Sequence, residues 1–94
     1  MNKIPYRYEC LLQLGDQNYY PDFTIMHPIT KNIFYWEHFG RMDDSAYVQK
    51  TFSKLQTYSD HGIIPTIQLI TTYETKQNPL NHDIIQNIID FTFK

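Results

Sequence analysis

The sequence is poor in cysteine, glycine and proline, and it lacks an excess of basic residues. Cys10 is the only cysteine, so no internal disulfide can form, and no cysteine–histidine spacing of the kind that binds zinc is present. Three glycines and five prolines among 94 residues do not indicate disorder. No apolar run has the length of a membrane span and no signal segment follows Met1, so we expect a soluble, cytoplasmic protein.

The charge balance bears on nucleic-acid binding. Eight Lys and Arg residues stand against ten Asp and Glu residues, for a formal net charge of −2. A domain that binds DNA tightly through its phosphates usually carries a basic excess, so this balance argues against strong DNA binding by the chain alone. A divalent cation at an acidic site would offset part of the negative charge. A DNA-binding surface could also belong to a partner or to a larger parent protein.

Aromatic and aliphatic residues are plentiful enough for one core. Hydrophobic residues make up 41% of the chain, with eight tyrosines and six phenylalanines, and we expect residues 1–94 to form a single domain. Runs of β-forming residues bounded by turn residues predict strands over 6–14, 21–27, 33–39 and 66–72, with turn residues at 16–18.

Two segments show helical periodicity instead. Asp43 or Asp44 can cap a helix over residues 44–61, which ends at Gly62. Its predicted buried positions are Val48, Phe52 and Leu55. Asn81 can cap a last helix with a buried stripe of isoleucines at positions 84, 85, 88 and 89. Three strands joined by short turns, then a helix and another strand, predict an α/β domain with a mixed sheet: an antiparallel meander followed by a β-α-β crossover.

The predicted hairpin over residues 21–39 brings two carboxylates together. Folding the strands about residue 29 or 30 places Asp22 opposite Glu37 or within two positions of it. Opposed side chains in an antiparallel pair lie about 4.5–5.5 Å apart. Two carboxylates at that separation repel each other unless a cation lies between them, and Mg²⁺ prefers such oxygen ligands.

Glu37 lies in a strand that we expect to be buried on both faces. Alternation puts Glu37 on one face with Ile33, Tyr35 and Phe39, whereas Trp36 and His38 point to the other face. A buried carboxylate is costly unless it is paired or bound to a metal. Glu37 is therefore either paired with a basic side chain of the core or part of a functional site, and the local context does not decide between the two.

The segment YYPDFTIMHPITKNIFYWEHFG (residues 19–40) resembles the PD-(D/E)XK, or restriction-endonuclease-like, nuclease superfamily, in particular a bacterial and phage-associated branch. Pro21-Asp22-Phe23 matches the first motif, and Glu37, in WEHFG, matches the second. The similarity continues through residues 42–75 and so covers nearly the whole chain. It implies that Asp22, Glu37 and the backbone carbonyl of His38 bind Mg²⁺ or Mn²⁺.

The sequence departs from the family pattern at the catalytic lysine. That lysine follows the second acidic residue by two positions, where this chain has Phe39. In several branches the lysine lies on the next helix, and the resemblance then assigns the role to Lys54, with Lys50 one turn earlier as the rival. Lys54 and Tyr58 share a helix stripe and resemble a Q-x-x-x-Y motif with lysine in the glutamine position. Either lysine could equally be a solvated helix residue, and Tyr58 could be a packing residue.

A second departure concerns the start of the fold. The family has a helix before its first strand, often with a glutamate, and we expect that helix to be missing here. Glu9 could supply a further carboxylate near the site, or it could face solvent or pair with Arg7. The resemblance implies a DNA nuclease. The alternative is a nuclease-fold module that no longer cuts and binds DNA or protein. In either case the chain could form a homodimer or be part of a larger protein.

Overall fold

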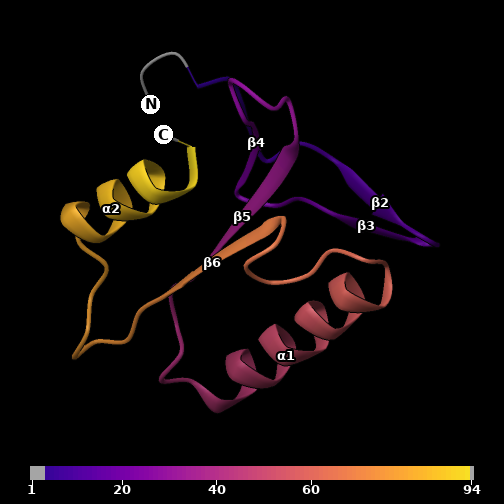
Figure 1. Ribbon diagram of the computed structural model, residues 1–94. Coiled ribbons are helices and arrows are strands. Elements are labelled where there is room, and N and C mark those ends of the chain that lie inside the picture. Colours follow the sequence, from indigo (N-terminus) through magenta and orange to yellow (C-terminus); the bar gives the residue numbers. More distant parts are fainter. Residues whose placement is uncertain (1–3, 94) are drawn as a thin grey trace.

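The computed structural model describes residues 4–93 as a small α/β domain (Figure 1). A four-stranded sheet has the order β1-β4-β5-β6, and β2 and β3 form a separate hairpin. In chain order the elements are β1 (Tyr6–Tyr8), β2 (Leu12–Leu14), β3 (Gln17–Tyr19), β4 (Phe23–Met26), β5 (Ile33–Phe39), α1 (Ser45–Asp60), β6 (Leu69–Tyr73) and α2 (His82–Phe93). Neither helix in this range is long and apolar enough to cross a membrane.

The sheet is mixed, as the sequence predicts. β1 pairs with β4, and β4 with β5, in antiparallel fashion. β6 returns through α1 and pairs with β5 in parallel, in the register Glu37↔Thr71. The β-meander, interrupted by one hairpin, and the β-α-β crossover are therefore confirmed.

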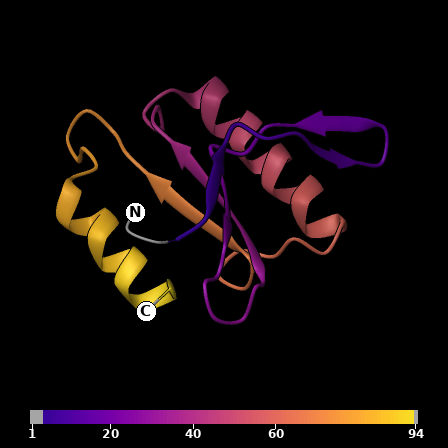
Figure 2. The same ribbon diagram turned by 90° about the horizontal axis from the view of Figure 1, so that it is seen from above.

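The two helices cover opposite faces of the sheet, with one core beneath each (Figure 2). Trp36 of β5 packs with Ile89 and Phe93 of α2. On the other face, Tyr35 packs near Tyr58 and Leu55 of α1. The alternation predicted for β5 is thus correct, and it places Glu37 on the α1 face.

The prediction of one strand over residues 6–14 is wrong. The chain breaks at Glu9, whose φ is +50°, in the left-handed region that a non-glycine residue rarely adopts. β1 therefore ends at Tyr8, and β2 pairs with β3 instead of with the main sheet. The predicted turn at 16–18 is also too long, because β3 begins at Gln17 and Gly15, with φ +61°, makes the turn.

The helix boundaries are close to those predicted. Asp44 caps α1 by accepting hydrogen bonds from the backbone N–H groups of Ala46 and Tyr47 at 3.0 and 3.2 Å. Gly62 follows the helix with a φ of +82°. The last strand begins later than predicted, at Leu69, because residues 63–68 form a turn. The side chain of Gln68 holds this turn through hydrogen bonds to the backbone.

The predicted inner faces are partly wrong. Phe52 is 62% exposed, and the buried residues of α1 are Thr51 and Tyr58. The face toward the sheet covers a polar site, described below, so apolar periodicity alone selects the wrong stripe. In α2, Ile89 is buried, but Ile84 is 44% exposed because it lies at the start of the helix, beyond the edge of the core.

Candidate active site

Asp22 and Glu37 face each other at the end of the β4–β5 ladder. The last pair in register is Phe23↔Trp36, so one further step places Asp22 opposite Glu37. The backbone of Phe39 bonds to the β6 side, because its carbonyl accepts from Glu74 N–H at 2.9 Å. By alternation Glu37 also bonds toward β6, which makes Asp22–Glu37 a non-hydrogen-bonded pair. In such pairs the side chains approach each other more closely.

Glu37 is a buried carboxylate with two strong partners on α1. Its side chain is only 3% exposed, and Oε2 lies 2.5 Å from Lys54 Nζ. The same oxygen accepts a hydrogen bond of 2.7 Å from the hydroxyl of Tyr58, which has no exposed surface. Burial, together with the adjacent Glu37, raises the pKa of Tyr58 well above its usual value, so the tyrosine stays protonated and keeps donating. The basic partner predicted for a buried Glu37 is therefore Lys54.

Both bonds to Glu37 end on the same oxygen. Among the described residues, Oε1 of Glu37 receives neither of them, and it is the oxygen that a cation could bind. The carboxylate is thus held at one oxygen by α1, and it lines the same cavity as Asp22.

A cavity of about 260 Å³ collects most of the predicted site residues. Asp22, Glu37, Lys50 and Lys54 all line it, as does His38. Tyr58 lies behind Glu37, within the core. Glu9 does not line this cavity: its side chain is exposed, and its backbone N–H donates to the carbonyl of Asp22 at 3.2 Å.

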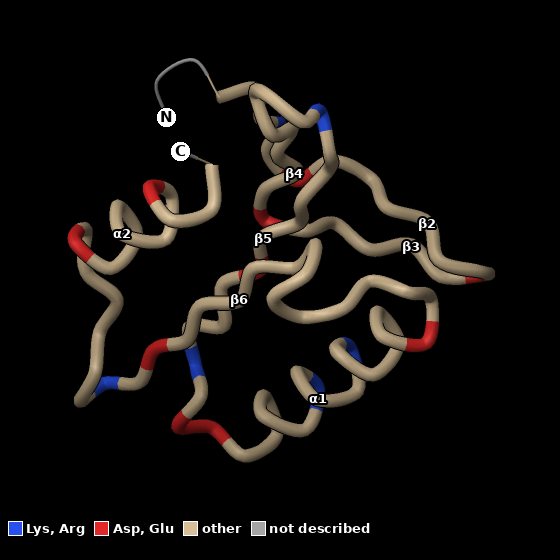
Figure 3. The backbone as a smooth tube through the Cα atoms, viewed as in Figure 1, with Lys and Arg blue, Asp and Glu red and all other residues tan. Residues whose placement is uncertain are grey.

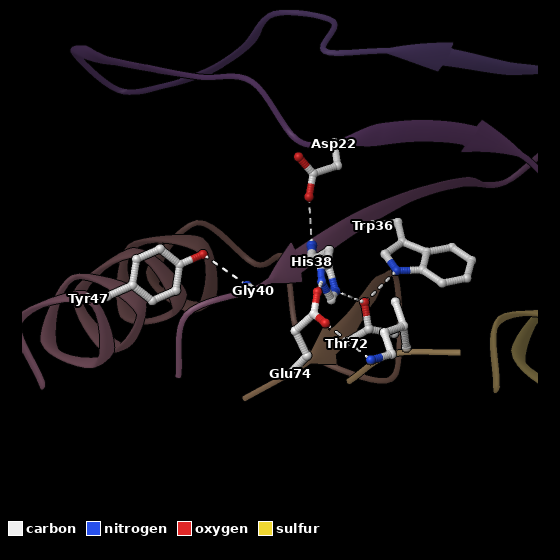
Figure 4. A network of polar contacts seen from close by, with 8 residues as sticks. Asp22, Trp36, His38, Gly40, Tyr47, Thr72 and Glu74 are labelled. Carbon is white, nitrogen blue, oxygen red and sulfur yellow. Dashed lines mark hydrogen bonds and ion pairs between the residues drawn. The ribbon is translucent and has the colours of Figure 1, made fainter. Parts of the chain in front are cut away.

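Three cavity residues were not found from the sequence: Tyr20, Tyr47 and Thr51. Tyr47 and Thr51 lie two turns and one turn before Lys54 on the same stripe of α1. Extending that stripe toward the start of the helix would have found them. Tyr47 accepts a hydrogen bond of 3.3 Å from Gly40 N–H, which ties the start of α1 to the end of β5 (Figure 4). For Tyr20 the sequence holds no comparable signal.

The backbone of His38 points toward Asp22. Oδ2 of Asp22 accepts a hydrogen bond of 2.7 Å from His38 N–H (Figure 4). In an extended strand, the N–H and C=O of one residue face the same neighbour, so the His38 carbonyl also faces the β4 side. The residue across from it in register is Pro21, which has no N–H to donate. The proline of the PD motif therefore leaves this carbonyl without a strand partner.

The ring of His38 belongs to a polar chain on the opposite face of the sheet. Trp36 Nε1–H donates to Thr72 Oγ1 at 3.1 Å, and Thr72 Oγ1 lies 2.9 Å from His38 Nδ1. His38 Nε2 lies 2.7 Å from Glu74 Oε1 (Figure 4). The hydrogen bond from His38 lowers the pKa of Glu74. With Glu74 ionised and the His38 proton on Nε2, every bond in this chain has one donor and one acceptor. Both ring nitrogens of His38 have hydrogen-bond partners here, so the ring is not available to bind a metal in the cavity.

The oxygen donors fit a small hard cation. Within residues 4–93 there is no cluster of three or more His, Cys, Asp and Glu side chains that could hold a metal. The candidate donors are therefore two carboxylates, Asp22 and Glu37, and the His38 carbonyl that Pro21 leaves without a strand partner. Mg²⁺ is commonly held by one or two carboxylates and keeps several waters, so this donor set suits it.

The basic side chains are few but well placed. Lys54 and Lys50 both line the cavity, with Lys50 one turn nearer the start of α1. Figure 3 shows the basic positions of α1 in blue. Both lysines could meet an anionic group that enters beside Asp22.

None of the family models, curated proteins and solved structures with which the chain was compared matches it.

Proposed function

We propose that this chain is a metal-dependent nuclease domain of the restriction-endonuclease-like fold, which hydrolyses phosphodiester bonds in DNA. The observation that carries the proposal is the joint placement of Asp22, Glu37 and Lys54 in one cavity, beside a backbone carbonyl that lacks a strand partner. The acidic pair on an antiparallel hairpin, followed by a helical crossover to a parallel strand, agrees with the resemblance in its sequence.

In this proposal Asp22, Glu37 and the His38 carbonyl would hold one Mg²⁺ or Mn²⁺. The chemistry supplied by such an ion would be polarisation of a phosphate and a lower pKa for a bound water. Lys54 has two tasks: it neutralises Glu37 before DNA arrives, and its ammonium group stabilises the charge that develops on the scissile phosphate. Tyr58 positions Glu37 through its hydrogen bond, and Lys50 attracts the phosphate at the mouth of the cavity.

A second function, a nuclease-fold module that binds DNA or protein without cutting, is favoured by one specific observation. Glu37 is already neutralised by Lys54 and hydrogen-bonded by Tyr58, and Asp22 is hydrogen-bonded to His38 N–H. A carboxylate pair satisfied in this way is stable without a metal. Cleavage separates the two functions.

The test is cleavage of plasmid and single-stranded DNA with Mg²⁺ or Mn²⁺, together with calorimetric titration of Mn²⁺. We expect the parent to bind Mn²⁺ and cut, and Asp22→Asn and Glu37→Gln to do neither. Asp60→Asn is the matched control, because Asp60 is an exposed carboxylate at the far end of α1 that accepts from Gln56. Cleavage by Asp22→Asn at the parental rate would refute the proposed role of Asp22. Mn²⁺ binding and DNA binding without cleavage would favour the non-cutting module.

A further inference from the structure

A second and larger cavity lies on the α2 face of the sheet. Its volume is about 580 Å³. One wall is the sheet, from Tyr6 and Tyr8 to Trp36, and the other includes Ile85 and Ile89 of α2. Cavities that are mostly apolar, with a few polar groups at one end, are the usual binding sites for small or planar organic groups.

The sheet wall is a row of aromatic rings. Tyr6 and Tyr8 meet Phe23 edge to face, at ring-centroid distances of 5.9 and 5.3 Å, and Phe23 meets Trp36 at 6.4 Å. Tyr6 is 51% exposed and Tyr8 is 65% exposed, and both lie on the edge strand β1. The row therefore begins with the two exposed rings of Tyr6 and Tyr8 and ends with the buried ring of Trp36.

This second cavity adjoins the candidate active site, because the two cavities share lining residues at the ends of β4 and β5. Asp22 and His38 line both cavities. The smaller cavity holds the lysines and the carboxylate pair, whereas the larger one holds aromatic rings. A polynucleotide strand that passes Asp22, just before the start of β4, would meet charges suited to its phosphate on one face of the sheet. On the other face it would meet rings suited to its base.

The net charge of the chain favours a contribution of the bases to the binding of DNA. With a net charge of −2, the protein has little electrostatic attraction for phosphates beyond Lys50 and Lys54 in the smaller cavity. Stacking of bases on aromatic side chains supplies affinity that is tolerant of sequence and needs no basic excess. A base in a duplex is already stacked and paired, so only an unpaired base can enter such a cavity at little cost.

We propose that the larger cavity binds an unpaired nucleobase next to the scissile phosphate, with Tyr8 as its principal stacking ring, and that the substrate is single-stranded DNA. The proposal rests on the nuclease function above and specifies its substrate. Phe23 supports the ring of Tyr8 from the sheet. Leu80 and Ile85 close the opposite side.

The experiment measures fluorescence anisotropy of a labelled short single-stranded DNA, with Ca²⁺ in place of Mg²⁺ so that binding is read without cleavage. The comparison ligands are an abasic strand of the same length and the matching duplex. We expect the abasic strand and the duplex to bind the parent at least about ten-fold more weakly. Tyr8→Ala should weaken binding of the base-bearing strand by about ten-fold. The slope of log Kd against log salt concentration should not change in this variant, since no phosphate contact is lost.

Two control variants locate the effect. Tyr8→Phe keeps the ring and should bind as the parent does. Phe91→Ala removes an even more exposed ring from α2, where Phe91 is 93% exposed and lines neither cavity, and should also leave Kd unchanged. The abasic comparison uses the parent protein alone, so it holds even if Tyr8→Ala folds poorly.

Equal affinity for base-bearing and abasic strands, tighter binding of the duplex, or unchanged binding by a folded Tyr8→Ala variant would each overturn the proposal. Cleavage is assayed separately on the same variants. Cutting without base-dependent binding would overturn the base cavity and leave the nuclease function standing. Base-dependent binding without cutting would overturn the nuclease function and leave the cavity assignment standing.

Discussion

Replacing Lys54 by methionine should destabilise the domain through Glu37. Methionine keeps much of the aliphatic stem but removes the ammonium group 2.5 Å from Oε2. Removing one partner of a fully buried ion pair costs about 3–5 kcal/mol. Lys54 is 30% exposed and the Tyr58 bond remains, so we expect a smaller loss of about 2–3 kcal/mol in the free energy of unfolding. For a domain of this size, that lowers Tm by roughly 10–20 °C.

The assay is urea unfolding followed by circular dichroism, for Lys54→Met, Glu37→Gln and the double variant. The neutral amide introduced by Glu37→Gln no longer needs a cation, so the double variant should regain most of the stability that Lys54→Met loses. Lys50→Met is the matched control: Lys50 is exposed and should change the free energy of unfolding by less than about 0.5 kcal/mol. A Lys54→Met loss as small as that of Lys50→Met would refute the reasoning. If Asp22 and Glu37 hold a cation, added Mg²⁺ should stabilise Lys54→Met more than the parent.

Three further predictions each concern the hydrogen bonds of one side chain. Tyr58→Phe leaves the ring but removes the donor to buried Glu37, and should cost about 1.5–3 kcal/mol in urea unfolding, with Tyr19→Phe as a control that keeps its ring contact. Asp44→Ala removes the N-cap of α1 and should lower the free energy of unfolding, measured by thermal unfolding, by about 1 kcal/mol. Asp44→Asn keeps a capping oxygen and should retain most of the stability. Equal losses in the two variants would contradict a capping role. The hydrogen bond from His38 lowers the pKa of Glu74 in the folded state below its usual 4.5. The ionised Glu74 carboxylate therefore stabilises the fold fully above about pH 4.5, and this stabilisation is lost as the pH falls through the lowered pKa. Glu74→Gln should make the free energy of unfolding less dependent on pH in this acid range. A pH dependence equal to that of the parent would contradict the stabilising role of the Glu74 carboxylate.

The fold class and the acidic pair could be predicted from the sequence because both depend on short-range patterns. Alternation along residues 33–39 determines which face Glu37 occupies, and the length of the loop before Ile33 determines the register with Asp22. Lys54 and Tyr58 follow from helical spacing, once the helix is known to cover that face.

Other features depend on long-range contacts or on local strain and left no such pattern. The left-handed conformation of Glu9 ends β1, but glycine and asparagine are the residues that usually indicate this conformation in a sequence, and neither stands at this position. The side chain of Phe52 is more hydrophobic than that of Thr51, but the helix turns Thr51 inward because α1 must bring Lys54 and Tyr58 to Glu37. The role of the His38 ring depends on Thr72 and Glu74, which lie more than thirty residues away in the sequence.

The position of His38 between the two faces of the sheet has a mechanical consequence. Asp22 holds its backbone N–H from one side, while Thr72 and Glu74 hold its ring from the other. His38 cannot move out of the strand without breaking hydrogen bonds to its N–H and to its ring at once. Its position at the end of the β4–β5 pair is therefore fixed before any ligand binds, and a ligand there meets a residue that needs little rearrangement.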